Sequence, residues 1–223
     1  MNVSAPLVAA IPVRNQLEWT RPLVMSLLDD DEVDQVWLFD NGSTDDTATW
    51  AAGIAAADPR FTVTARPRAR LYGMWNEMVA RASLTPNTHL AILNNDLTMA
   101  HGALRLMQQA MEGYDLAFID RDRGIEDPLE PHAIDADWTD RTGWAFMLRA
   151  DFWRGQPYAI DPGLRIWWGD DDIARRAQAR GGRLSVVKGI GCFHAISQTT
   201  YPGDMAADTE HDRLYFRSIW DDD

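Results

Sequence analysis

The chain has 223 residues, of which 46% are hydrophobic and 25% charged, as in an ordinary soluble globular protein. Its formal net charge of −13 argues against broad binding to the phosphate backbone of a nucleic acid. No apolar run approaches the roughly 18 residues of a membrane span. The single cysteine excludes a disulfide within the chain, and no basic residue precedes the apolar stretch near the N-terminus. We therefore expect a reduced, cytoplasmic location.

Short apolar runs alternate with helix-like segments in the first half of the chain. We predict buried strands at residues 7–11, 35–39, 61–65, 89–93 and 116–119. We predict helices between them at residues 22–28, 46–57, 73–82 and 104–111, with Pro22 in a first helical turn and Ser43 to Asp46 as a capping box. This alternation predicts an α/β fold with a mainly parallel sheet covered on both faces.

The pattern is less regular after about residue 120. Residues 121–140 hold two prolines and many acids, so we expect a long loop there. Apolar segments follow at 143–148 and 184–194, with a short helix near Asp151 and another that begins near Asp170. We find no internal repeat and no low-complexity linker, so we predict one domain over residues 1–223.

Polar side chains follow the first, second and fourth predicted strands. The segments are Ile11-Pro12-Val13-Arg14-Asn15, Asp40-Asn41-Gly42-Ser43-Thr44-Asp45 and Asn94-Asn95-Asp96. Each alone is also ordinary turn chemistry. Ligands of parallel sheets bind beyond the carboxyl ends of the strands. The three segments together therefore predict a nucleotide pocket, in which Asp40 and Asn41 bind a base or ribose and Asp96 holds a hard cation beside phosphates.

Two tryptophans and three carboxylates meet at the start of a predicted helix, in Trp167-Trp168-Gly169-Asp170-Asp171-Asp172. Aromatic faces beside acids suit a site that stacks a sugar ring and takes a proton from its hydroxyl. The alternative is structural. Aspartate is favoured at helix N-caps and in first turns, and the tryptophans could belong to the core.

In their order and spacing, these motifs resemble family 2 glycosyltransferases of the GT-A fold, which use nucleotide sugars. The resemblance covers roughly residues 5–196 and rests on Pro12 to Asn15, Asp40 to Thr47, Gly73 and Asn76, Asn94 to Asp96, Gly143 to Arg149, Asp170 to Asp172 with Arg176, and His194. The run Trp167 to Ile173 also resembles a segment of β-1,4-galactosyltransferases. Gly169 stands where both families carry Glu, so we expect the acceptor to be held differently.

The resemblance implies an inverting transferase in which residues up to about 115 bind the nucleotide sugar and the rest form the acceptor side. It implies that Asp170 is the base that activates the acceptor hydroxyl, and that Asp96 and His194 hold Mn²⁺ or Mg²⁺. We expect Asp172 to be structural. The implied donor-binding residues are Pro12, Arg14, Asn15, Asp40, Asn41, Arg70, Gly73, Asn76, Asn94 and Asn95. The implied acceptor-binding residues are Trp144, Trp167, Trp168 and Asp171.

We expect a UDP-sugar as the donor, with GDP- or dTDP-sugars as alternatives. The acceptor hydroxyl could belong to a glycan, a protein, a small molecule or a modified nucleic-acid base, and the acidic balance disfavours the last of these. Two other functions stay open: a nucleotidyltransferase, and a non-catalytic module that binds nucleotide sugars or carbohydrates. Slow release of nucleoside diphosphate without an acceptor would distinguish an enzyme from a binding module.

Overall fold

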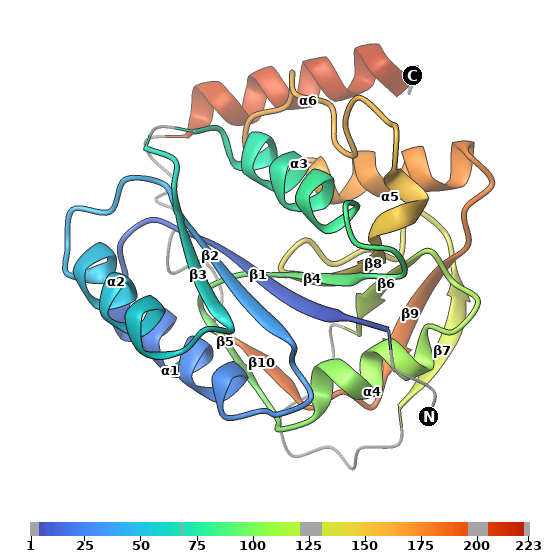
Figure 1. The fold of residues 1–223 in the computed structure, drawn as a ribbon. Coiled ribbons are helices and arrows are strands. Elements are labelled where there is room, and N and C mark those ends of the chain that lie inside the picture. The colour runs from blue at the N-terminus through green and yellow to red at the C-terminus, as the bar shows by residue number, and fades with distance from the viewer. Residues whose placement is uncertain (1–4, 68, 121–130, 196–204, 221–223) are drawn as a thin grey trace.

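A mixed β-sheet divides the molecule into two helical layers (Figure 1). The computed structural model describes residues 5–67, 69–120, 131–195 and 205–220, and in this part of the chain the sheet has eight strands. Helices α1, α2 and α4 lie on one face of the sheet, and α3, α5 and α6 lie on the other. The predicted α/β fold is confirmed.

The elements follow one another along the chain with few long connections. They are β1 (Leu7–Val13), α1 (Leu17–Leu28), β2 (Gln35–Asp40), α2 (Thr47–Ala57), β3 (Phe61–Ala65), α3 (Leu71–Ala82), β4 (His89–Leu93), β5 (Leu97–Met99), α4 (Ala103–Ala110), β6 (Leu116–Ile119), β7 (His132–Ala136), β8 (Ala145–Arg149), the 3-10 helix η1 (Ala150–Trp153), α5 (Gly169–Ala179), β9 (Leu184–Lys188), β10 (Cys192–His194) and α6 (Ala206–Trp220). The main sheet has the order β3-β2-β1-β4-β8-β6-β9-β7, and β10 pairs with β5 in a separate ribbon.

Strand β1 is buried along its whole length because helices cover both faces of the sheet. Leu7, Ala9 and Ile11 pack in the core formed with α1 and α4, whereas Val8 and Ala10 pack in the core formed with α3 and α5. This explains why the sequence of β1 is a continuous apolar run and not an alternation of polar and apolar residues.

The strand order reverses at β1, with β2 and β3 on one side of it and β4 on the other. Strand β1 pairs with β2 as far as Val13, but its pairing with β4 ends at Ala10. The ends of β1 and β4 therefore separate, as expected at the switch point of an open α/β sheet. Pro12, which has no N–H to donate, lies in the part of β1 that does not pair with β4.

The predicted start of the first helix was wrong. Helix α1 begins at Leu17, so Pro22 lies inside it and not in its first turn. Pro22 removes the hydrogen bond to the carbonyl of Glu18. Both residues are exposed, so solvent can hydrate that carbonyl and the helix tolerates the proline.

The predicted loop at 121–140 contains strand β7, which pairs antiparallel with β9 at the edge of the sheet. Residues 121–130 of that prediction lie outside the described part of the chain. The sequence pattern did not indicate β7 because no residue of this strand is fully buried, so it lacks a marked apolar alternation. The predicted apolar segment at 184–194 forms two strands. Strand β9 belongs to the main sheet, whereas β10 pairs with β5 outside it.

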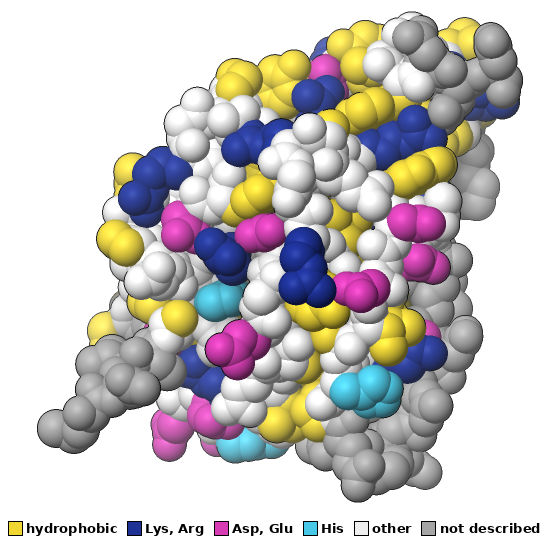
Figure 2. Space-filling view, turned by 90° about the vertical axis from the view of Figure 1, so that its right-hand side faces the viewer, with side chains coloured by type: hydrophobic (Ala, Val, Ile, Leu, Met, Phe, Trp, Pro, Cys, Tyr) yellow, Lys and Arg dark blue, Asp and Glu magenta, His cyan; other side chains and the backbone are white. Residues whose placement is uncertain are grey.

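The side of the molecule that faces the viewer in Figure 2 carries interspersed acidic and basic side chains, and hydrophobic and basic side chains gather in its upper part.

Helices α5 and α6 are joined by cation–π contacts. The guanidinium of Arg175 lies 3.6 Å from the ring centre of Trp138 and also faces Phe216 and Trp220. Among the described helices, none combines the length and the apolar composition needed to cross a bilayer.

Candidate active site

A cavity of about 380 Å³ lies at the carboxyl ends of β1, β2 and β4, where β1 and β4 separate. Helix α3, the start of β8 and the start of α5 form its other walls. The structure thereby brings together many of the residues that the sequence placed in a site, although they are far apart in the chain. Those that line the cavity are Pro12, Arg14, Asn41, Asn94, Asn95, Asp96, Trp144, Trp167, Trp168, Asp170 and His194.

Asn15 and Asp40 do not line this cavity but join the loops that follow β1 and β2. The N–H of Thr44 donates to Oδ1 of Asn15 at 2.7 Å, and the N–H of Asn15 donates to Oγ of Ser43 at 2.7 Å. Ser43 in turn donates from its N–H and Oγ to Asp40 Oδ1, at 2.9 and 2.6 Å. The predicted capping box is wrong, because Ser43 binds between loops and Asp46, the N-cap of α2, makes no side-chain cap bond.

Three further predicted donor-binding residues, Arg70, Gly73 and Asn76, also lie outside the lining of the cavity. The carboxamide of Asn76 accepts the N–H groups of Ala159 and Ile160 at 2.8 and 2.9 Å, and donates to the Ile160 carbonyl at 2.7 Å. Arg70 donates to a backbone carbonyl of the same loop at 3.3 Å. Gly73 is exposed. Two of the three thus brace the loop that leads to α5.

Asp96 and His194 face each other in the wall of the cavity, with 3.1 Å between Asp96 Oδ1 and His194 Nε2. They meet because β10 pairs with β5 in a register that places His194 opposite Leu97. The ring of Trp144 stacks on the imidazole, with 5.1 Å between ring centroids. Within the described residues, neither of the two facing atoms has a hydrogen-bond partner, although both are buried.

This pair fits a divalent cation. A carboxylate oxygen and an imidazole nitrogen are both metal ligands, and here neither atom makes a hydrogen bond within the described protein, although the two lie 3.1 Å apart. In the described ranges, no three or more His, Cys, Asp or Glu side chains are grouped so that they could hold a metal ion by themselves. A cation held by Asp96 and His194 would therefore take its remaining ligands from substrate oxygens and water, as Mg²⁺ commonly does at phosphate sites.

Two more buried polar atoms on the cavity wall lack a partner among the described residues: Oδ1 of Asn41 and Nε1 of Trp75. Asn41 uses only its amide nitrogen, which donates to the Ala69 carbonyl at 3.0 Å. Trp75 packs edge-on against Tyr72 and Phe146, which have ring centroids at 5.2 and 5.1 Å. Buried polar groups in folded proteins are almost always hydrogen-bonded. Unpartnered groups on a cavity wall therefore indicate a ligand.

The three acids at the start of α5 have different surroundings. Asp170 is half-buried and lines the cavity. Asp171 is buried and pairs with Arg141 at 2.5 Å. Asp172 is completely buried and accepts hydrogen bonds from Asp161 N, Arg176 Nε and Trp220 Nε1 at 2.6, 2.7 and 2.9 Å. None of the three is an N-cap, because the N-cap residue is Trp168 and no side chain caps the helix.

A glycine leaves room for the carboxylate of Asp170. A Cβ added at Gly143 would lie 2.9 Å from Asp170 Oδ2 and 3.0 Å from its Cγ. Contacts this short at Cβ are almost never observed, so any larger residue at position 143 would displace the carboxylate. The segment Gly143 to Arg149 thus begins with a glycine at a point where the acid Asp170 of α5 packs directly on the backbone.

A second glycine, Gly169, is matched to Tyr72 of α3. A Cβ at position 169 would lie 2.1 Å from the Tyr72 ring. The Gly169 N–H donates to the Tyr72 hydroxyl at 3.0 Å, and that hydroxyl donates to the Ile166 carbonyl. Burial, together with the charge of Asp170, raises the pKa of Tyr72 well above its usual value and keeps the hydroxyl protonated. Tyr72 therefore occupies the space that a side chain at 169 would enter.

Sequence reasoning missed Tyr72 and Trp75 because both have the spacing of core residues on an amphipathic helix. The only sequence signal for Tyr72 is indirect. A glycine at 169, where the resemblance found in the sequence predicts a glutamate, requires another group to fill the space. Nothing in the sequence alone indicates which group does so, because Tyr72 and Gly169 are separated by 97 positions.

The family model described as Glycosyl transferase family 2 matches residues 9–164. Solved structures with a similar fold include a mannosyltransferase from Pyrobaculum calidifontis in complex with GDP-Man and Mn²⁺ (TM-score 0.72, 14% identity, covering 100% of this chain and 66% of that one). They also include residues 1–349 of TarS from S. aureus (TM-score 0.63, 14% identity, 95% and 65%). A search of the curated proteins finds no match.

A third similar structure is glucosyl-3-phosphoglycerate synthase from Mycobacterium tuberculosis, in complex with Mn²⁺, UDP and glucosyl-3-phosphoglycerate (TM-score 0.65, 15% identity, 96% and 79%). At these sequence identities, the likeness to the three solved structures shows the fold alone. The chain spans less than two thirds of the length of the mannosyltransferase and of the TarS fragment.

Replacing Gly169 with Ala should destabilise the protein by about 1–3 kcal/mol, because the added methyl group overlaps the Tyr72 ring. Gly73→Ala is the matched control. This glycine is also helical, and a Cβ there meets nothing within 4 Å, so the change should be neutral or stabilise by up to about 1 kcal/mol. Urea denaturation measures both effects, and equal free energies of unfolding for the two variants would contradict the steric explanation.

The contribution of Asp171 to stability should depend on pH. Burial, aided by the charge of Asp170 and opposed by Arg141, raises its pKa from 3.8 to about 6. Folding thus favours the protonated acid, and this stabilisation is present below about pH 4 and lost as the pH rises through about 6. Relative to the wild type, Asp171→Asn should gain about 2–3 kcal/mol of stability between pH 4 and pH 7. If denaturation shows that the stability difference between Asp171→Asn and the wild type does not change with pH, the pKa of Asp171 is not raised by folding.

Proposed function

The chain belongs to glycosyl transferase family 2, and from this premise we propose that it transfers a sugar from a nucleotide sugar to the hydroxyl of an acceptor. One observation supports this proposal above all. Among the described residues, four buried polar atoms without hydrogen-bond partners lie on the wall of one cavity. They belong to Asn41, Trp75, Asp96 and His194. Together they suit a ligand that is rich in oxygen atoms and carries a metal-binding diphosphate.

The donor would bind at the ends of β1, β2 and β4. Asn41 Oδ1 would accept a hydrogen bond from the base or ribose, Trp75 Nε1 would donate to an oxygen of the nucleotide sugar, and Arg14 would face the phosphates. A UDP-sugar is the proposed donor. The synthase from M. tuberculosis, which binds UDP, supports it, and the mannosyltransferase, which binds GDP-Man, supports a GDP-sugar as the alternative.

Asp96 and His194 would hold Mn²⁺ or Mg²⁺, and an imidazole ligand favours Mn²⁺. When bound, the cation would neutralise the charge that develops on the leaving diphosphate. Mn²⁺ is present in the complexes of the mannosyltransferase and the synthase. The stacked ring of Trp144 restricts the orientation of His194, so Nε2 stays directed at Asp96.

Asp170 is the proposed general base, because it alone of the three acids lines the cavity. The acceptor hydroxyl would attack the anomeric carbon from the side opposite to the diphosphate. The new C–O bond forms as the bond to the diphosphate breaks, and the proton passes to Asp170. Attack from the opposite side inverts the anomeric configuration. Trp167, which is 39% exposed, and Trp168 would offer ring faces to the acceptor.

Replacing Asp170 with Asn should lower the rate of transfer and of donor hydrolysis by at least about 100-fold, because the amide cannot accept the proton. Donor affinity, measured by calorimetry, should stay close to normal. Asp46→Asn is the control, since Asp46 is also an acid at a helix start, but is exposed and makes no cap bond. Wild-type activity in the Asp170 variant would rule out its role as the base.

Replacing Asp96 or His194 with Ala should weaken the binding of Mn²⁺ and of the nucleotide sugar together, by at least about 10-fold. Chelation of the metal should reduce the wild type to the same level. His101→Ala, at an exposed histidine outside the cavity, should leave both affinities unchanged. Titration calorimetry with Mn²⁺ present and absent provides the measurement. A metal dependence equal to that of the wild type in both variants would show that these side chains are not the ligands.

A further inference from the structure

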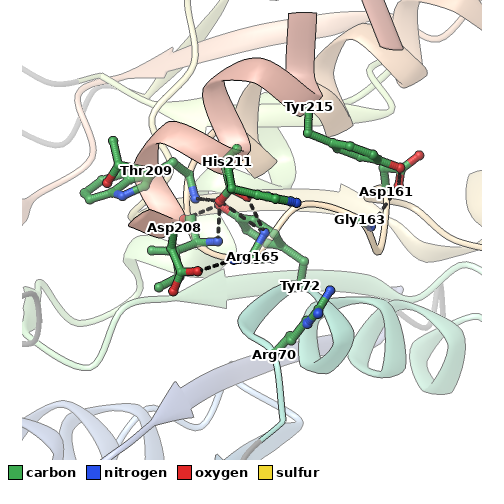
Figure 3. A network of polar contacts seen from close by, with 12 residues as sticks. Arg70, Tyr72, Asp161, Gly163, Arg165, Asp208, Thr209, His211 and Tyr215 are labelled. Carbon is green, nitrogen blue, oxygen red and sulfur yellow. Dashed lines mark hydrogen bonds and ion pairs between the residues drawn. The ribbon is translucent and has the colours of Figure 1, made fainter. Parts of the chain in front are cut away.

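Helix α6 lies beyond the residues that the family model matches, and none of its described side chains lines the cavity. It nevertheless packs against the turn at residues 165–169, which carries Trp167 and Trp168 and leads into Asp170. Figure 3 shows Asp208 and Tyr215 of α6 directed at Arg165 and Asp161 of the preceding loop, with Tyr72 of α3 on the opposite side.

The central contact of this network is Asp212, which is completely buried. Its carboxylate accepts hydrogen bonds from three consecutive backbone N–H groups: Arg165 at 3.0 and 3.1 Å, Ile166 at 2.8 Å and Trp167 at 2.9 Å. His211 Nδ1 lies 2.9 Å from the same carboxylate. A buried charge is costly unless it is hydrogen-bonded. The three N–H bonds are charge-assisted and hold the backbone of the turn firmly.

The turn is held from its other side by Tyr72, whose hydroxyl binds the Ile166 carbonyl and the Gly169 N–H. Between the two anchors, Trp168 has a φ of 61°, in the left-handed region that bulky residues rarely adopt. Such a conformation persists only where the surroundings determine it strongly. The ring of Trp168 stacks on Phe216 of α6, with 6.5 Å between centroids.

The other hydrogen bonds and ion pairs that join α6 to the rest of the described structure reach the same region. Asp208 pairs with Arg165 at 2.6 Å, and the Tyr215 hydroxyl donates to Asp161 at 3.0 Å. Trp220 donates to Asp172 at 2.9 Å. These partners all belong to residues 161–172, on the acceptor side of the cavity, and not to the strand ends where the donor is proposed to bind.

We propose that Asp212 is a positioning residue for sugar transfer, which holds the acceptor-side tryptophans and the base Asp170 in the geometry for attack on the donor. This inference rests on the proposed function. Misplacing a reacting group by about 1 Å can lower a rate by about 100-fold. Loss of the Asp212 contacts should therefore slow the reaction and leave nucleotide binding intact.

Asp212→Asn tests this inference, because the amide keeps the shape of the carboxylate but places an N–H donor against backbone N–H donors. The assay is release of nucleoside diphosphate in the presence of Mn²⁺, with water as the acceptor. The substrate is whichever of UDP-glucose, UDP-galactose, UDP-N-acetylglucosamine and GDP-mannose the wild type hydrolyses fastest. The kcat should fall by about 10- to 100-fold, with the donor KM and the Kd of the nucleoside diphosphate within about twofold.

Glu210→Gln is the matched control, because Glu210 is an exposed acid on the same helix that pairs only with Arg213 in the described contacts. Its kcat, KM and Kd should equal those of the wild type. Hydrogen exchange gives a direct readout of the turn. The amides of residues 165–167 should exchange faster in Asp212→Asn than in Glu210→Gln at a temperature well below unfolding.

If Asp212→Asn does not fold, Tyr72→Phe carries the test, because it releases the same turn from the side of α3. The same separation of kcat from Kd is expected. A kcat equal to that of Glu210→Gln, or a loss of nucleotide affinity as large as the loss of kcat, would overturn the inference alone. A wild type that neither binds nor hydrolyses any of these nucleotides would instead contradict the proposed function, and the inference with it.

Discussion

The unequal pairing of β1 with its two neighbours is the constraint on which the candidate active site depends. Hydrogen bonds join β1 to β2 as far as Val13, whereas the ladder with β4 ends at Ala10. The backbone beyond Ala10 therefore opens, and the chain after β4 turns away into the short ribbon of β5 and β10. That ribbon brings His194 to Asp96. The cavity and the candidate metal pair are both consequences of where one ladder ends.

Close packing decides the geometry at the wall of the cavity where α3 meets the start of α5. Gly143 lies against the carboxylate of Asp170, and Gly169 lies against the ring of Tyr72. In each case a Cβ would collide with the group that it faces, so the absence of a side chain allows the approach. Hydrogen bonds from α3 and α6 then hold the turn at residues 165–169, and a bond from α6 holds Asp172 of the helix that follows. Polar contacts and steric fit thus act on the same few residues.

The sequence pattern predicted much of the fold, because periodic burial identifies elements that are covered on one or both faces. Strands β3, β4 and β6 have the predicted bounds. The pattern failed where burial does not shape the sequence, at the edge strand β7 and at Pro22 on the exposed side of α1. In the cavity, it identified strand-end residues such as Asn41 and Asp96. It did not identify Trp75 or Asp212, which belong to helices and have no local motif.

By itself, the amino-acid sequence determined the fold class and the family, and it predicted the strand ends at which the cavity lies, because these depend on local periodicity and on short motifs. Only the tertiary structure decided how the residues of those motifs are used. Asn15, Asp40 and Asn76 brace loops, and the three acids of α5 face three different environments. The physical reason is that burial and hydrogen-bond partners come from residues far away in the chain, as with Tyr72 for Gly169 and Asp212 for Trp167.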